Sequence, residues 1–371
     1  MAATPDVLVI GGGIAGLSAA AALSAEARVV VLEAEEQIGF HSSGRSATML
    51  HYALGDRLVR ALTLASRPFF DNPPDGFPSV GHRMAVLIPA QEEERADLDA
   101  LEAEIAPFAA LERLDAKGVH DLCPLLKDDV LHGIADRNGI RLDPHALLQG
   151  NLRQLKARGG ELVTGQRISA IEFRNGLWEV TSAGGERYSA PILINAAGSW
   201  ADQVAVMAGV PPLGLRPLRR TIITFDAPAS SDLGGLPFTK TIHDELYFAP
   251  ESGRLFASPM DEVPSDPCDA QPDEYEVALA AHRMEERTTV KVERIHSRWA
   301  GLRTFTPDRH PAVGFASEAE GFFWLAGQGG FGLQTSPALS AIAAALISGG
   351  PWPVADVTAD DLLPGRFFKA A

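Results

Sequence analysis

The chain is poor in cysteine and in positive charge. Of its 371 residues only two are cysteine, Cys123 and Cys268, which excludes a disulfide framework and a CxxC metal pair. We therefore expect a reducing, cytoplasmic compartment and no metal site. Lysine and arginine number 32 against 48 aspartates and glutamates, so the net charge is −16. This charge argues against nucleic acid and against an anionic membrane surface as partners.

Long apolar runs are also lacking. The apolar stretch VLVIGGGIAGLSAAAAL near the N-terminus contains four glycines and is a poor membrane span, so we expect no integral membrane segment. The N-terminus has neither the basic region nor the cleavage site of a signal peptide. With 46% hydrophobic and 22% charged residues, the composition is typical of a soluble globular protein of one large or two medium domains.

The same N-terminal stretch has the spacing of a dinucleotide-binding βαβ unit. An apolar run at 7–10 predicts a buried strand, a GxGxxG motif then opens an alanine-rich helix, and a second apolar run at 29–32 ends in Glu33. The glycines allow a close approach to a pyrophosphate, which the free N–H groups of the helix N-terminus would bind. The alternative is a glycine-rich turn in a generic α/β unit. The residues expected to contact the cofactor here are Gly11, Gly13, Ile14, Ala15, Gly16, Glu33 and Ala34.

After Glu33 the chain does not resume a regular strand–helix repeat. It continues into the loop GFHSSGRSAT at 39–48, which consists mostly of glycine and small hydroxyl residues with one histidine and one arginine. Small residues let a chain lie along a flat cofactor. The loop, together with the position of the glycine motif at the start of the chain, favours FAD over NAD.

The rest of the chain predicts a mixture of helices and strands. Hydrophobic periodicity and turn residues predict helices at 54–72, 92–114 and 143–160, the last capped by Asp143. Strands are predicted at 83–90, 191–196, 219–226, 246–259 (with a turn at 250–253) and 288–299. A second glycine signature, GFFWLAGQGGFGLQTSPALSAIAAALI at 321–347, predicts a strand at 322–326, a glycine turn and a helix from about 335–337. Its N–H groups would face an electron-rich group such as a flavin carbonyl.

Together with LINAAGSWADQV and GLRTFTPDRHPAVG, these motifs resemble the FAD-dependent D-amino acid oxidase superfamily, which includes glycine oxidase and sarcosine oxidase, over nearly the whole chain. Within it, HSSGRSA, ALTLASRPFFDNPPDGF, WAGLRTF and GQGGFGLQTS are most similar to D-arginine dehydrogenase. The resemblance implies an α/β chain with a glutathione-reductase-type FAD-binding Rossmann domain at 1–80, 141–212 and 300–371. It also implies an α+β, mixed-sheet substrate-binding domain at 81–140 and 213–299.

The resemblance also implies further contacts to FAD. They come from three glycine-containing segments and are His41, Ser42, Ser43, Arg45, Ser46, Ala47; Ala197, Gly198, Trp200; and Gly301, Gly329, Gly330, Phe331, Gly332, Leu333, Gln334. Sarcosine oxidase attaches its flavin through a cysteine near the segment written here as AGLRTFTP, which has none. We therefore expect FAD to be bound noncovalently.

On the substrate side, the resemblance implies that Arg303 and Arg220 bind an α-carboxylate and that Tyr247 adds a hydrogen bond. A planar, always-charged guanidinium suits a carboxylate best. Arg219 competes with Arg220 for this role, and each arginine has the alternative of a structural salt bridge. We expect a small amino-acid-like substrate, hydride transfer from its Cα to flavin N5, hydrolysis of the imine to a 2-oxo acid and ammonia, and reoxidation by a quinone, a dye or O2.

Several positions depart from the D-arginine dehydrogenase pattern. Arg83 stands where that enzyme carries an acid for a cationic side chain, so it would repel basic substrates and attract acidic ones; the alternative is a structural ion pair. Met49 and Leu54 replace a histidine and a tyrosine of its mobile substrate loop, and His51 and Tyr52 lie close by in sequence. Gly330 and Gln334 complete the expected substrate contacts. A non-basic, possibly acidic, D-amino acid is therefore the expected substrate.

Three other functions stay open. A 2-hydroxy acid dehydrogenase would use the same carboxylate clamp but needs a base, for which His51, His243 and His310 are candidates. An oxidase of a secondary amine such as an N-substituted glycine would release an aldehyde or glyoxylate. A flavoprotein with a blocked site would serve as a subunit of a larger complex.

Overall fold

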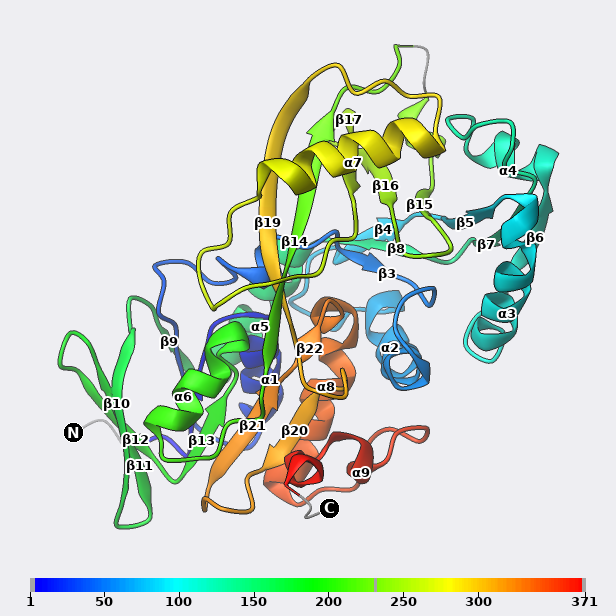
Figure 1. Cartoon of the computed structure of the whole chain (residues 1–371). Coiled ribbons are helices and arrows are strands. Elements are labelled where there is room, and N and C mark those ends of the chain that lie inside the picture. The colour runs from blue at the N-terminus through cyan, green and yellow to red at the C-terminus, as the bar shows by residue number, and fades with distance from the viewer. Residues whose placement is uncertain (1–3, 230–231, 369–371) are drawn as a thin grey trace.

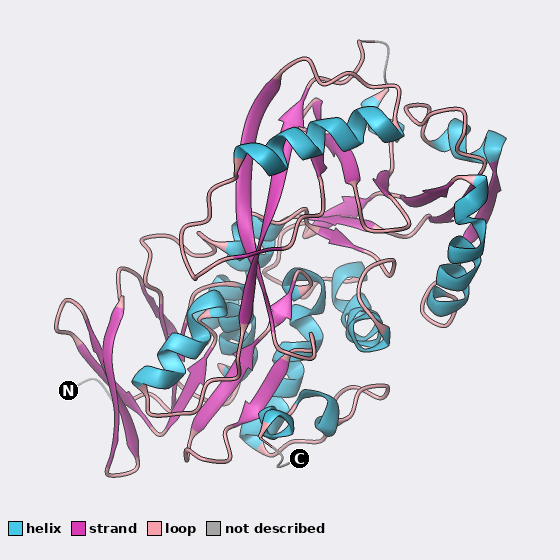
Figure 2. Ribbon diagram, in the orientation of Figure 1, coloured by secondary structure: helices cyan, strands magenta, loops and turns pink. Residues whose placement is uncertain are grey.

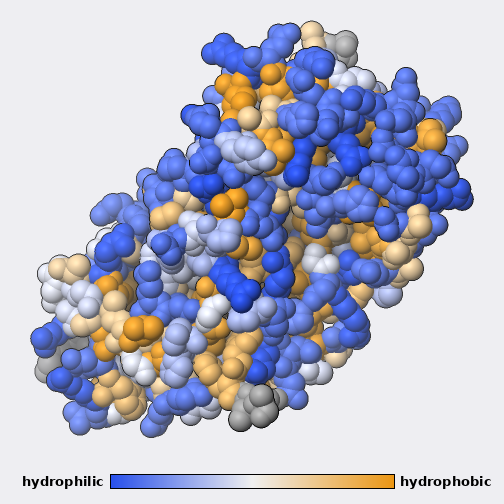
Figure 3. All heavy atoms as spheres, in the orientation of Figure 1, coloured by the Kyte–Doolittle hydropathy of each residue, from blue (hydrophilic) through white to orange (hydrophobic). Residues whose placement is uncertain are grey.

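The computed structural model describes residues 4–229 and 232–368. The outermost parts of the expected FAD domain, 1–3 and 369–371, and residues 230–231 of the expected substrate domain lie outside the described residues. Within the described part of the chain, none of the helices is long and apolar enough to cross a membrane. The face of the molecule drawn in Figure 3 is mainly hydrophilic, with hydrophobic residues scattered between polar ones.

The lower half of the molecule in Figure 1 is built on a six-stranded sheet with the order β20-β21-β13-β1-β2-β9. Every neighbouring pair in it is parallel except β20 and β21, which run antiparallel. The strands are β1 (Val7–Ile10), β2 (Val29–Leu32), β9 (Glu161–Val163), β13 (Ile192–Asn195), β20 (Ala312–Phe315) and β21 (Phe322–Ala326). The apolar runs at 7–10 and 322–326 are wholly buried, as strands covered on both faces require.

Helices cover one face of this sheet and a small antiparallel sheet covers the other. The helices are α1 (Ile14–Leu23), α5 (Pro144–Ala157) and α8 (Gly332–Ser348), with α2 (Arg57–Asp71) packed on α8. The small sheet consists of β10 (Ile168–Arg174), β11 (Leu177–Ser182) and β12 (Arg187–Ala190). Trp178 of β11 packs against Phe322 of β21, so the second face is also buried. Helix α6 (Ala201–Met207) follows β13, and α9 (Ala359–Leu362) lies near the C-terminus.

The upper half contains a second, larger sheet with the order β22-β19-β14-β17-β16-β15-β5-β7-β6, and β18 pairs with β14. Figures 1 and 2 show α7 (Glu274–Arg287) lying across this sheet, with α3 (Arg95–Ile105) and α4 (Ala116–Leu122) beside β6 and β7. Its strands are β5 (Val86–Ala90), β6 (Glu112–Asp115), β7 (His132–Asp136), β14 (Arg216–Phe225), β15 (Phe238–Lys240), β16 (Tyr247–Glu251), β17 (Arg254–Ser258), β18 (Val263–Pro264), β19 (Ile295–Phe305) and β22 (Gln328–Gly329).

Two features connect the halves. Strands β14 and β19 are long enough to extend from the upper sheet down to the lower one (Figure 1). A three-stranded sheet, β3 (Met49–Leu50), β8 (Ile140–Leu142) and β4 (Gly81–Arg83), lies where the loop at 39–48 ends. The expected domain boundary at residue 300 falls inside β19, which is one continuous strand. The division of the chain into two domains stays a prediction.

The predicted βαβ unit, the turn between β16 and β17 and the strand at 322–326 are confirmed, but four predicted elements are wrong in part. The helix predicted at 92–114 ends at Ile105, because Pro107 cannot continue it, and β6 follows. Residues 288–294 are not a strand; the Thr289 N–H donates to the Leu125 carbonyl instead of to a sheet neighbour. The strand predicted at 83–90 is divided between β4 and β5.

The fourth is helix α8, which begins at Gly332, earlier than predicted. Helix α7 was not predicted, because it lies in the part of the chain expected to form the mixed sheet. The signals for α7 are present in the sequence. Asp273 caps it by accepting from the Tyr275 N–H, and Val277, Ala280 and Met284 recur at helical spacing and are buried.

The capping prediction for α5 is confirmed, because the Asp143 side chain accepts a hydrogen bond from the Ala146 N–H. Replacing Asp143 by alanine should lower the free energy of unfolding by about 1 kcal/mol, since this N–H loses its acceptor. Urea unfolding followed by circular dichroism measures the change. Asp143→Ser, which keeps a capping oxygen, should stay close to the parent, and an equal loss in both variants would contradict the capping role.

Candidate functional site

The first glycine motif forms a close turn between β1 and α1. Gly11 has φ +112°, and a Cβ on Gly16 would lie 2.0 Å from the Gly11 carbonyl oxygen, so both positions require glycine. The N-cap residue of helix α1 is Gly13, which has no side chain to cap the helix. The first N–H of the helix, that of Ile14, donates instead to Ser43 Oγ in the loop, at 2.9 Å. The turn therefore presents a helix N-terminus to the loop at 39–48, the arrangement that binds phosphate groups.

Glu33 ends β2 beside this turn. Its carboxylate is buried and accepts from the Gly12 N–H at 2.5 Å and from the Glu35 N–H at 2.9 Å. It lines a cavity that we call the Glu33 cavity. The lining residues are Ile10, Gly11, Gly13, Leu32, Glu33, Ala34, Glu35, Gly39, Phe40, His41, Ser42, Ser43, Gln166, Arg167, Ile168, Ala196, Ala197, Gly198, Ser199, Trp200, Gln203, Val204 and Met207. The His41 and Trp200 rings, 4.6 Å apart, form part of its wall.

A second cavity, which we call the Arg303 cavity, continues from the first past Ser42 and Ser43 of the loop. The lining residues are Gly13, Ile14, Ala15, Ser42, Ser43, Arg45, Ser46, Ala47, Thr48, Met49, His51, Leu54, Ala196, Gly198, Arg220, Ile222, Phe238, Tyr247, Gly301, Leu302, Arg303, Thr304, Gly327, Gln328, Gly329, Gly330, Phe331, Gly332, Leu333 and Gln334. Every residue expected to contact the cofactor, except Gly16, therefore lines one of two adjoining cavities.

The second glycine signature forms one wall of the Arg303 cavity. Helix α8 begins at Gly332 without a side-chain cap, so its first N–H groups are available to a ligand. A Cβ on Gly330 would lie 2.1 Å from Arg303 Nε, so a larger residue would displace the guanidinium from its present position. The glycine turn and the arginine are thus packed directly against each other.

Strand pairing places the two predicted arginines on one face. In the β14–β19 ladder, Arg220 lies opposite Gly301 and Leu218 lies opposite Arg303, which makes Arg220 and Arg303 diagonal neighbours. Both line the Arg303 cavity. Because side chains alternate along a strand, Arg219 points to the opposite face, where it pairs with Glu276 of α7 at 3.2 Å. The structure thus separates the two adjacent arginines.

Arg220 is held in place by backbone acceptors. Its Nε donates to the Asp261 carbonyl at 2.8 Å and its Nη2 donates to the Met260 carbonyl at 3.1 Å. Arg303 is 15% exposed and pairs with Glu262 at 2.8 Å. Burial and the neighbouring charge of Arg220 lower the pKa of Arg303 to about 9, against the effect of Glu262. Its guanidinium is therefore still charged at neutral pH.

The remaining predicted substrate residues divide into two groups. Met49, His51, Tyr247, Gly330 and Gln334 line the Arg303 cavity. The Tyr247 ring packs between Phe238 and Phe256, with centroid distances of 5.3 and 6.1 Å, which fixes the orientation of the phenol. Gln334 donates to Thr63 Oγ1 at 2.8 Å, so its amide is anchored in the protein.

Tyr52 and Arg83 lie outside the lining of this cavity. Tyr52 is buried and stacks on Phe108, with the ring centroids 6.5 Å apart. Arg83 is exposed, pairs with Asp71 at 2.8 Å and donates to the Asn138 carbonyl at 3.0 Å. This is the structural ion pair that the sequence left as the alternative. A contact between Arg83 and the substrate stays a prediction, which this position does not favour. The Arg83 side chain lies on the protein surface, where both of its partners are protein groups.

Of the three histidines considered as a base, only His51 lines the Arg303 cavity. Burial, with the nearby charge of Lys240, lowers the pKa of His51 to about 3, so its ring is neutral. The Ala53 N–H donates to Nδ1 at 3.2 Å, so the proton of the neutral ring is on Nε2. His51 can therefore donate a hydrogen bond through Nε2 but has no free nitrogen to act as a base.

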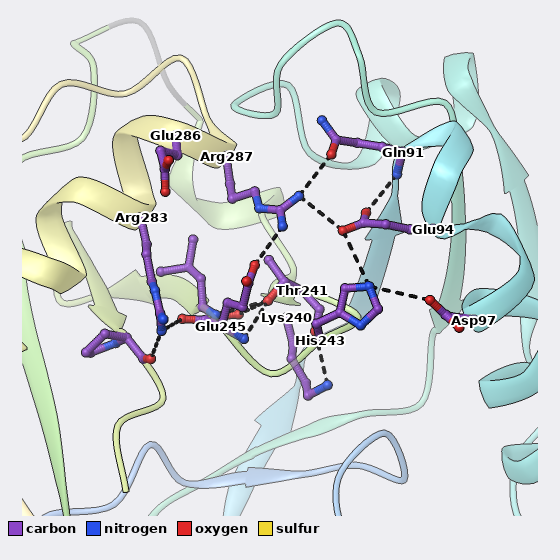
Figure 4. A network of polar contacts seen from close by, with 12 residues as sticks. Gln91, Glu94, Asp97, Lys240, Thr241, His243, Glu245, Arg283, Glu286 and Arg287 are labelled. Carbon is purple, nitrogen blue, oxygen red and sulfur yellow. Dashed lines mark hydrogen bonds and ion pairs between the residues drawn. The ribbon is translucent and has the colours of Figure 1, made fainter. Parts of the chain in front are cut away.

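The other two histidines are bound elsewhere. Figure 4 shows His243 in a polar network around Arg287, with its ring 3.5 Å from Asp97 and 4.0 Å from Glu94. His310 pairs with Asp56, the N-cap of α2. Neither residue lines the Arg303 cavity.

Arg45, expected at the cofactor, lines the Arg303 cavity but uses its guanidinium to fix the loop. It donates to the carbonyls of Ala270 and Ala300 at 3.0 and 3.3 Å and pairs with Asp269 at 2.6 Å. Several lining residues were not predicted. Ile222, two residues after Arg220 on the same strand, could have been found by alternation, whereas Phe238 and Gln166 carry no local signal.

The comparisons with known proteins agree with this geometry. The family described as FAD dependent oxidoreductase (DAO) matches residues 6–346. The chain belongs to this family. It is similar to glycine oxidase of Bacillus licheniformis, with 25% identity over 93% of this chain and 94% of that protein. The similarity to D-arginine dehydrogenase within the family stays a prediction.

Solved structures show the same fold. L-proline dehydrogenase from P. horikoshii has a TM-score of 0.86 at 21% identity, covering 100% of this chain and 99% of that one. L-alpha-glycerophosphate oxidase from Mycoplasma pneumoniae, solved with FAD bound, has a TM-score of 0.85 at 17% identity, covering 93% of this chain and 95% of that one. The fold is therefore a Rossmann-type FAD-binding unit with a mixed-sheet substrate unit, as predicted.

The residues present fit FAD. Two helix N-termini whose N-cap residues form no side-chain hydrogen bond, those of α1 and α8, border two adjoining cavities. Glycines without room for a Cβ form part of the walls. The chain is an FAD-dependent oxidoreductase of this family. Glu33 would hold the ribose hydroxyls, the α1 N-terminus the pyrophosphate, and the α8 N-terminus the flavin carbonyl.

Replacing Glu33 by alanine should weaken FAD binding by about 10- to 100-fold, because hydrogen bonds to a buried carboxylate are lost. Titration of apoprotein with FAD, followed by the quenching of flavin fluorescence, gives the Kd. Glu36→Ala removes an exposed carboxylate three residues away and should leave the Kd unchanged. Equal binding by the Glu33 and Glu36 variants would refute the assignment.

Precipitation with acid should release FAD into the supernatant, since no cysteine is present in the segment AGLRTFTP. Absorbance of the supernatant and of the redissolved pellet measures the partition. Flavin that stays with the pellet would show a covalent link and overturn the expectation.

Proposed function

We propose that the chain oxidises a D-amino acid with a non-basic side chain to the 2-oxo acid and ammonia. The observation that carries this proposal is the diagonal pair of Arg220 and Arg303 in a cavity that adjoins the glycine turn before α8. Two guanidiniums on one face match the two oxygens of an α-carboxylate. Their positive charge also disfavours a basic substrate side chain.

The protein residues would orient the substrate. Arg303 and Arg220 hold the α-carboxylate, and Tyr247, on the neighbouring part of the sheet, donates a hydrogen bond to the same group. FAD, when bound, supplies the acceptor for the two electrons and the hydrogen that leave Cα. When Cα has lost this hydrogen with its two electrons, and the amine has lost a proton, an imine remains. Water hydrolyses the imine to the 2-oxo acid and ammonia. Orientation is the main protein contribution, since His51 has no free nitrogen to act as a base.

A secondary amine, such as an N-substituted glycine, is the second candidate. It would use the same carboxylate clamp, and one structural neighbour is an L-proline dehydrogenase. Oxidation of a 2-hydroxy acid is less well supported, although a glycerophosphate oxidase shares the fold. It requires a base for the hydroxyl proton, and none of the three candidate histidines supplies one in the cavity. An acidic side chain no longer has support from Arg83.

Replacing Arg303 by methionine should lower kcat/KM at least about 100-fold, because the carboxylate loses a buried charged partner. The substrate is first identified by anaerobic bleaching of the flavin with D- and L-amino acids, imino acids and 2-hydroxy acids. Arg298→Met, on the same strand but in an exposed pair with Glu274, is the matched control and should keep full activity. FAD content should be equal in both variants, and unchanged turnover by the Arg303 variant would refute the proposal.

A further inference from the structure

A protein carboxylate occupies the predicted carboxylate site. One oxygen of Glu262, Oε1, accepts from Arg303 at 2.8 Å, from Arg309 at 2.9 Å and from Arg220 at 3.4 Å. Burial acts to raise the pKa of Glu262, but the three arginines outweigh it and hold that pKa below its usual value. The group is therefore an anion placed among three cations, two of which are the proposed clamp.

These groups lie where the Arg303 cavity adjoins a more exposed recess. Arg220, Arg303, Leu54 and Phe331 line both that cavity and a neighbouring recess, which Glu262 and Arg309 line as well. The exposed fraction of the side chains falls inward, from 52% for Arg309 and 33% for Glu262 to 15% for Arg303 and 9% for Arg220. A ligand that enters through the recess meets the Glu262 side chain before it reaches Arg303.

The arginines are not equally free to change partner. Arg220 keeps two backbone acceptors whether or not Glu262 is present. Among the described residues, Glu262 is the only carboxylate paired with Arg303. Arg309, stacked 3.8 Å above the Phe305 ring, can keep Glu262 after Arg303 has turned to a ligand. The cluster thus has a second place for its own anion.

We propose that Glu262 is a specificity-determining residue of the substrate site: it occupies the clamp in the absence of substrate and cedes Arg303 only to a ligand that brings a carboxylate. This inference rests on the proposed role of Arg303. A neutral amine or alcohol cannot replace Glu262, because a mostly buried guanidinium would then be left without an anion. A carboxylate replaces one ion pair by another, and Glu262 remains on Arg309.

Binding of benzoate to the oxidised holoenzyme, followed by the change in flavin absorbance, tests this without turnover. Glu262→Gln should lower the Kd of benzoate about tenfold, since the ligand no longer competes with a fixed anion. Glu262→Asp keeps the charge but is one methylene shorter, so it should also lower the Kd. An unchanged or raised Kd in both variants, with FAD content and Tm like the parent, overturns the proposal.

Glu112→Gln is the matched control, because it makes the same change of net charge at an exposed pair with Arg137. Its Kd should equal that of the parent. An equal fall in the Glu112 and Glu262 variants would show a general effect of net charge and overturn the proposal.

A double-mutant cycle distinguishes two roles of Arg309: holding Glu262 away from Arg303, or attracting the benzoate anion directly. Arg309→Gln alone should raise the Kd, because Glu262 then stays on Arg303, and it should have no effect when Glu262 is already glutamine. An equal rise in both backgrounds overturns the proposal.

Arg303→Met distinguishes the two proposals: if it binds benzoate normally, the clamp itself is wrongly assigned. If it loses benzoate while Glu262→Gln changes nothing, only the role of Glu262 fails.

Discussion

The site depends on the antiparallel pairing of β14 with β19. This ladder runs for the length of both strands, reaching from the upper sheet to the mostly parallel sheet below. Its register sets Arg220 and Arg303 on one face and Arg219 on the other. A slip of one residue would turn every side chain of one strand to the opposite face, so the clamp exists only in this register.

Charge balance is the second constraint on the site. Three arginines meet close to a cavity, and a buried cation without a partner is unstable. Arg220 is stabilised by backbone carbonyls, and one carboxylate, Glu262, accepts hydrogen bonds from all three arginines. Under our proposal, the same balance of charge also selects a ligand that brings a carboxylate.

Much of the FAD side of the site could be predicted from the sequence. The glycine spacing, the buried strands and Glu33 are all within about 25 residues of one another, so local pattern is sufficient. The substrate side was harder. Arg83 matches a family position, but its side chain pairs with Asp71. His51 was a candidate base, but its Nδ1 accepts a hydrogen bond from the Ala53 N–H. No pattern in the chain signalled Glu262 or Phe238.

The sequence by itself determined the family, the cofactor and the residues that could hold a carboxylate, because short motifs encode turns and helix ends whose chemistry is local. Only the tertiary structure decided which of these residues face one cavity. Segments near residues 45, 220, 303 and 330 meet in the Arg303 cavity, the segment near 262 lines the adjoining recess, and no local spacing relates them. Their relative positions follow from strand register and from which buried charge finds which partner, and both are properties of the folded chain.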